Sequence, residues 1–128
     1  MPLKILLVED HADTADVVAR LMKRWGHLVD VAATLGDARK LTAAPDCAEY
    51  DLLLCDIGLP DGSGGDLMRE LSARCGTRGI ALTGFGMPDD IDEARNAGFA
   101  DHLLKPIPAQ TLKELIDREV ARKATAAG

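Results

Sequence analysis

Short apolar runs alternate along the chain with segments in which apolar residues recur every three or four positions. The five runs of strand length are 3–8, 27–33, 52–56, 79–83 and 101–105. Each run is followed by a segment whose apolar residues share one helical face, and the intervening loops are short. Strand–helix alternation of this kind predicts a parallel sheet with right-handed crossovers and helices on both faces. We therefore expect an α/β fold of five strand–helix units.

The run at 52–56 is the most informative of the five. Four apolar residues lead without a break into Asp56, and turn-forming residues follow at once. A continuous apolar run bounded by turn signals is typical of a strand buried on both faces. Asp56 then lies where the strand leaves the core, and its charge is costly there unless another group compensates it.

Three of the other four predicted strands also lead into polar or charged residues. Glu9 and Asp10 follow the first strand, Thr83 ends the fourth, and Lys105 ends the fifth. Ligands of open parallel sheets bind in the crevice at the carboxyl ends of the strands. The sequence thus predicts a site at this edge that contains these residues and Asp56.

The chemistry of this set points to a metal and to phosphate. Clustered carboxylates repel one another, and Mg²⁺ relieves the repulsion by binding carboxylate oxygens, a carbonyl and water. Glu9, Asp10, Asp56 and the backbone carbonyl of Gly58 are the candidate ligands. Asp56 is then the candidate nucleophile toward a phosphoryl group, which Lys105 would help to neutralise.

Composition narrows the possible partners. The chain has 128 residues, 47% of them hydrophobic, and a net charge of −6, which disfavours binding of nucleic acid through this chain. Three cysteines without metal-ligand spacing predict no disulfide framework. We find no signal-peptide pattern and no stretch of transmembrane length, so the expected location is the cytoplasm, without membrane contact.

Several residues have simpler interpretations. We expect His11 and His27 to be surface residues rather than metal ligands, and Asp61 to serve the turn that contains it. Residues 1–123 are expected to form the single domain, and residues 124–128 a frayed tail.

The ordered set of motifs resembles the receiver domain of bacterial two-component response regulators. The resemblance covers residues 2–123 and is carried by five pieces of sequence: Val8-Glu9-Asp10, Asp56 with Leu59-Pro60, Gly64, Leu82-Thr83-Gly84, and Lys105-Pro106. It implies a flavodoxin-like, doubly wound sheet of five strands in the order 2-1-3-4-5.

The resemblance also implies a function. Asp56 would accept a phosphoryl group from a phosphohistidine on a sensor or hybrid histidine kinase, or on a histidine phosphotransfer protein. Asp10, Asp56 and the Gly58 carbonyl would hold Mg²⁺, with Glu9 assisting. Lys105 would pair with the phosphate and Thr83 would move toward it. The domain would be a signalling switch rather than an enzyme, read out by an unknown downstream protein on the face of the fourth helix, fifth strand and fifth helix.

Three positions bear on what the resemblance implies for switching and dephosphorylation. His102 stands where the family often has a switching Tyr or Phe, and the segment around it is more similar to receivers that work with hybrid histidine kinases. Phe85 and Gly58 occupy positions that modulate dephosphorylation in the family. We expect Phe85 to restrict water access to the phosphorylated site.

Two other functions fit the sequence poorly, and a third stays open. A phosphatase that forms an aspartyl phosphate needs an acid two residues after the nucleophile, where this chain has Gly58. A nucleotide or flavin binder needs a glycine-rich turn after the first strand, where this chain has acids. A receiver-like interaction module that works without phosphorylation stays open as the alternative.

Overall fold

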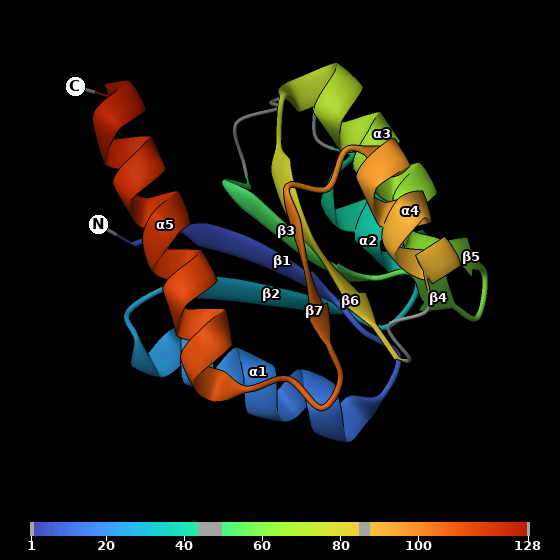
Figure 1. Cartoon of the computed structure of the whole chain (residues 1–128), viewed down its shortest axis with the longest axis horizontal. Helices are drawn as coiled ribbons and strands as arrows, with labels where there is room; N and C mark the ends of the chain where they lie inside the picture. Colours follow the sequence, from blue (N-terminus) through green and yellow to red (C-terminus); the bar gives the residue numbers. More distant parts are fainter. Residues whose placement is uncertain (1, 44–49, 85–87, 128) are drawn as a thin grey trace.

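The computed structural model describes residues 2–43, 50–84 and 88–127, and its centre is a five-stranded parallel sheet (Figure 1). Its strands lie in the order β2-β1-β3-β6-β7, and every pair of neighbours is parallel. The strands are β1 Lys4–Val8, β2 Leu28–Ala32, β3 Leu52–Asp56, β6 Arg78–Thr83 and β7 Asp101–Leu104. Counted without the two short strands β4 and β5, this order is 2-1-3-4-5, so the predicted flavodoxin-like topology is confirmed.

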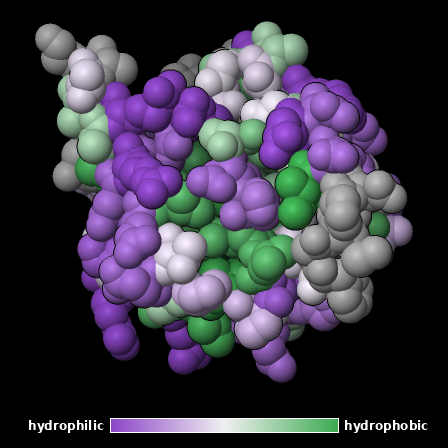
Figure 2. All heavy atoms as spheres, viewed as in Figure 1, coloured by the Kyte–Doolittle hydropathy of each residue, from purple (hydrophilic) through white to green (hydrophobic). Residues whose placement is uncertain are grey.

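Helices cover both faces of the sheet. Figure 1 shows α1 and α5 on one face and α2, α3 and α4 on the other. Their bounds are α1 Ala12–Arg24, α2 Leu35–Leu41, α3 Gly64–Cys75, α4 Pro88–Ala97 and α5 Ala109–Ala127. In the space-filling view of the same side, hydrophilic residues cover the outer surface of the helices and apolar ones gather between them (Figure 2).

The alternation of side chains along the strands divides the core into two layers. In β3, Leu53 and Cys55 join the cluster under α2, α3 and α4, while Leu52 and Leu54 join the cluster under α1 and α5. All four are fully buried. A strand that contributes to both layers must be apolar at every position, which explains the unbroken run before Asp56.

A small hairpin follows β3 and was not predicted. It pairs β4 (Gly58–Leu59) with β5 (Gly62–Ser63). Asp61 at its tip accepts hydrogen bonds from the backbone N–H groups of Leu35 (2.9 Å) and Gly36 (3.0 Å), at the start of α2. Asp61 therefore does more than serve its own turn: its carboxylate caps a helix 25 residues earlier in the chain.

Helix α5 continues to Ala127, into the segment that was expected to be a frayed tail. The domain boundary between residues 123 and 124 stays a prediction. None of the helices in the described ranges is long and apolar enough to cross a membrane.

His27 differs from the expectation of a surface residue. It is buried between α1 and β2, and its Nδ1 accepts a hydrogen bond from the backbone N–H of Leu3 at 3.0 Å. Burial lowers the pKa of His27, and Asp117 of α5 opposes this only in part. The ring must be unprotonated at Nδ1 to accept this bond, so protonation conflicts with the fold.

The buried His27 predicts that the domain loses stability in mild acid. Its folded-state pKa lies below the unfolded value of about 6.5, so the unfolded chain binds more protons and the free energy of unfolding falls as pH drops below about 6.5. Asparagine can accept the Leu3 bond without titrating. We expect the free energy of unfolding of His27→Asn, measured in urea, to fall less than that of the parent as the pH is lowered from about 7.5 to about 5.5. Equal losses would contradict this role.

Candidate functional site

The carboxyl ends of the parallel strands bring the predicted residues to one edge of the sheet. Glu9 follows β1, Asp56 ends β3, Thr83 ends β6 and Lys105 follows β7. Asp56, Thr83 and Lys105 line a cleft of about 620 Å³, to which Gly58 also contributes. The predicted juxtaposition of these residues is therefore observed.

Lys105 bridges the two buried carboxylates of this edge. Its Nζ lies 2.7 Å from Oδ2 of Asp56, 2.8 Å from Oε1 of Glu9 and 2.7 Å from Oε2 of Glu9. The backbone of Lys105 is fixed as well, since its N–H donates to the carbonyl of Thr83 at 2.9 Å. The ammonium group of Lys105 thus lies against two negatively charged carboxylates that come from different strands.

The two acids respond differently to this environment. Burial raises the pKa of Asp56 and the Glu9 carboxylate adds to the effect, while Lys105 and the Gly58 N–H oppose it only partly. Burial also acts on Glu9, but hydrogen bonds from Lys105 and His11 outweigh it and lower the pKa of Glu9. Burial alone would lower the pKa of Lys105, and its bonds to Asp56 and Glu9 raise it instead. Of the two acids, Asp56 alone has a raised pKa, and burial is the main cause.

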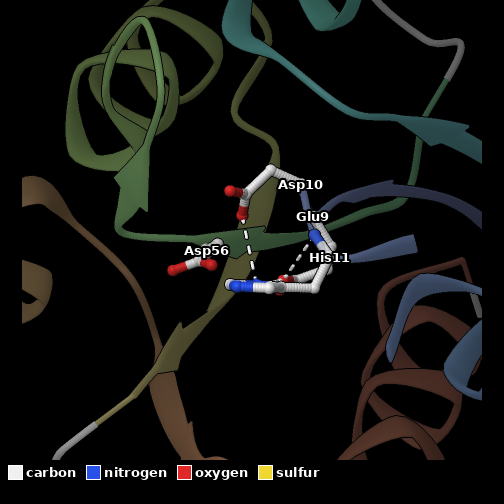
Figure 3. A group of neighbouring side chains, drawn as sticks. All are labelled: Glu9, Asp10, His11 and Asp56. Atoms are coloured by element: carbon white, nitrogen blue, oxygen red, sulfur yellow. Dashed lines mark hydrogen bonds and ion pairs between the residues drawn. The ribbon is translucent and has the colours of Figure 1, made fainter. Parts of the chain in front are cut away.

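Glu9 and Asp56 also belong to a group of four potential metal ligands beside Lys105. Glu9, Asp10, His11 and Asp56 each offer one potential ligand atom, and these atoms all lie within 4.8 Å of one another. Figure 3 shows the group, with the His11 ring beside the carboxylates of Glu9 and Asp10. Nδ1 of His11 lies 2.8 Å from Glu9 Oε1 and 3.4 Å from Asp10 Oδ1. His11 is exposed, as expected, but its place in the acidic group was not predicted.

The donor set of this group fits a small hard cation. Three carboxylates supply the oxygen ligands that Mg²⁺ prefers, and the exposed Asp10 leaves room for the waters that Mg²⁺ retains. Gly58 adjoins the group, because its N–H donates to Oδ1 of Asp56 at 3.1 Å. The ligand roles of these residues stay predictions.

Thr83 carries a buried hydroxyl group at the end of β6. Its side chain is 2% exposed, and within the described residues its hydroxyl makes no hydrogen bond. A buried hydroxyl without a partner is costly, so it calls for a ligand that supplies one. Since Thr83 lines the cleft, an oxyanion beside Asp56 is a suitable partner.

The family resemblance also singled out His102 and Phe85. His102 is half-buried in β7 and pairs with Ala81 of β6, and a switching role for it stays a prediction. Phe85, expected to shield the site from water, lies outside the described residues.

The family assignment follows from comparison with known proteins. A family model described as the response regulator receiver domain matches residues 5–117. The chain belongs to this family. Among solved structures, the receiver is similar to a response regulator receiver domain protein from Clostridium thermocellum, with a TM-score of 0.86, 27% identity, and coverage of 97% of this chain and 98% of that one.

Curated relatives place receivers of this kind in longer proteins. The chain is 38% identical over 120 residues to the aerobic respiration control sensor protein ArcB of Escherichia coli K12 and 33% identical over 114 residues to the response regulator protein PilR of Pseudomonas aeruginosa. These matches cover 91% and 88% of this receiver but only 15% of ArcB and 25% of PilR. The resemblance to receivers of sensor kinases is thereby confirmed.

The backbone around Gly64 is closely packed against the end of β3. A Cβ at this position would collide with the backbone carbonyl of Asp56 and lie 2.8 Å from Cys55 Sγ. We therefore expect Gly64→Ala to lower the free energy of unfolding by about 1–3 kcal/mol or more in urea unfolding. At Gly58 a Cβ meets nothing within 4 Å, so Gly58→Ala is the control, with a change below about 1 kcal/mol. Similar losses in both variants would contradict the packing argument.

The raised pKa of Asp56 predicts that its charge destabilises the metal-free fold and that Mg²⁺ offsets this destabilisation. Because the folded state raises its pKa, the folded protein binds protons more readily than the unfolded chain, and stability falls as pH rises through the titration of Asp56. We expect Asp56→Asn to be more stable than the parent at neutral pH without divalent cations. Millimolar Mg²⁺ should stabilise the parent by about 1–3 kcal/mol and the variant much less. Thermal unfolding with and without Mg²⁺ measures both effects, and equal Mg²⁺ stabilisation would contradict the ligand role.

Proposed function

We propose that this receiver accepts a phosphoryl group from a phosphohistidine onto Asp56 and thereby acts as a switch in a two-component phosphorelay. The observation that carries the proposal is the bridge from Lys105 Nζ to Asp56 at 2.7 Å and to Glu9 inside one cleft. The bridge holds a cation where charge must be neutralised when a phosphoryl group arrives.

Asp56 has the properties of an acceptor in this scheme. A carboxylate oxygen of Asp56 forms a bond to phosphorus as the bond from phosphorus to the donor imidazole nitrogen breaks, and the imidazole leaves with a proton. Lys105 is already in contact with Asp56 and neutralises the oxygens of the transferred group. The hydroxyl of Thr83, which has no partner among the described residues, then gains a hydrogen-bond acceptor.

Asp10, Asp56 and the carbonyl of Gly58 would hold Mg²⁺, with Glu9 assisting. When bound, Mg²⁺ supplies positive charge to the transferring oxygens and offsets the repulsion within the acidic group. The proximity of the carboxylate atoms supports this assignment.

The proposed donor is a sensor or hybrid histidine kinase, or a histidine phosphotransfer protein. Similarity to the receiver region of a sensor protein supports this class. Because such kinases consume ATP, we place the transfer in the cytoplasm. The face of α4, β7 and α5 is the proposed readout surface, where Thr83 and His102 would respond to the phosphate, for a downstream protein that is not yet known.

Labelling with a small phosphodonor tests the acceptor. Incubation of the parent with acetyl phosphate and Mg²⁺ should add one phosphoryl group, observed by intact mass, and the label should be lost in alkali as expected for an acyl phosphate. Asp56→Asn should abolish the label, because the amide cannot replace the carboxylate as nucleophile. Lys105→Met should lower the labelling rate about tenfold or more.

The matched control for this experiment is Asp66→Asn, which removes one carboxylate from the exposed surface of α3. It should label like the parent. A label that persists in Asp56→Asn would overturn the assignment of the acceptor. Absence of label in the parent, with Mg²⁺ present, would favour the alternative of an interaction module that works without phosphorylation.

A further inference from the structure

Glu93 of α4 lines the cleft that contains Asp56. Its Oε1 accepts a hydrogen bond from the hydroxyl of Ser63 at 2.6 Å. Ser63 is itself fixed, because it is the N-cap of α3 and its Oγ accepts from the backbone N–H of Gly65 at 3.1 Å. The single hydroxyl proton of Ser63 is therefore committed to the Glu93 carboxylate.

The packing of α4 against α3 holds this contact in place. A Cβ at Gly65 would lie 3.1 Å from the Cβ of Ala97, so the two helices approach closely at the start of α3. Ala94, next to Glu93, and Ala97 are both buried in the core under this face. Glu93 is thus presented by a packed surface of α4 rather than by a free end.

Among the side chains that the structure describes, no cation pairs with the carboxylate of Glu93. Both Glu93 and Ser63 line the cleft that contains Asp56 and Lys105. Among side chains in the ranges 2–43, 50–84 and 91–125, no Lys, Arg or His forms an ion pair with Glu93. Two basic side chains line the cleft, and both already pair with other carboxylates: Lys105 with Glu9 and Asp56, and His11 with Glu9 and Asp10.

We infer that Glu93 is a specificity-determining residue whose carboxylate, held in the cleft by Ser63, disfavours small anionic phosphodonors at Asp56. The inference rests on the proposed phosphoacceptor function. A phosphodonor must bring a negatively charged group into a cavity that contains an uncompensated negative charge, and the repulsion raises the free energy of its approach. Glu93 touches neither Asp56 nor Lys105 and acts through its charge alone.

The same repulsion affects donors of different size unequally. A phosphohistidine on a protein gains binding energy from contacts outside the cleft, which offsets the cost of entry. A free acyl phosphate has no such contacts. Glu93 thereby favours a protein-borne donor over small metabolites of the acyl phosphate class.

Removal of the charge with retention of the hydrogen bond tests the inference. In Glu93→Gln the amide oxygen can still accept from Ser63, so α4 keeps its place. Asp92→Asn is the matched control, because it makes the same change in net charge one position away, at an exposed site outside the cleft lining. The probe is acetyl phosphate with Mg²⁺. Its phosphoryl group is transferred to a carboxylate oxygen of Asp56 and acetate leaves.

We expect the initial labelling rate of Glu93→Gln to exceed that of Asp92→Asn by about two- to tenfold at low ionic strength. This excess should shrink toward one in about 1 M salt, since screening weakens a charge effect but not a structural one. Equal rates of the two variants, or an excess that salt does not reduce, would overturn the inference while leaving the acceptor function intact. Failure of the parent and all variants to label would overturn the proposed function and this inference with it.

Discussion

The contact on which this domain depends is the bridge from one ammonium group to two buried carboxylates. Lys105 and Glu9 are 96 residues apart, and Asp56 comes from β3, one of the two strands between β1 and β7. Both carboxylates are largely shielded from bulk water, because Glu9 is 1% and Asp56 6% exposed. Loss of the lysine would leave both charges without this partner, which costs stability.

The architecture of the sheet makes that bridge possible and keeps it compact. Parallel strands end at the same edge, so acids and a base that are far apart in sequence arrive together without long loops. The start of α3 must then pass directly over the end of β3, where Gly64 lies against the carbonyl of Asp56. The absence of a side chain at that one position allows the helix to approach the site this closely.

The sequence predicted the parts of the structure that depend on local pattern. The unbroken apolar run before Asp56 is a direct consequence of burial on both faces, and the polar strand ends follow from the position of the crevice. These two rules were sufficient to collect Glu9, Asp56, Thr83 and Lys105 at one edge.

The failures have a common physical cause. Asp61 caps a helix that precedes it, and His27 accepts from Leu3, just before β1. Each of these polar side chains finds its partner across the fold, and pattern along the chain carries no record of such a partner. The same polar residue types occur in turns and on surfaces for local reasons, so the local interpretation was favoured each time.

The anchoring of α5 is uneven along its length, and this separates two kinds of motion. Its first half is held by Leu112 and Ile116, which are completely buried, close to the strand end that supplies Lys105. Its second half is tied to the opposite rim by the pairs Glu119–Arg78 and Lys123–Asp51, which water partly screens. Transient opening of the last turns therefore costs little free energy and stays far from the cleft, so the carboxyl-terminal half of α5 can exchange its amide protons or adapt to a neighbour while the acidic edge remains rigid.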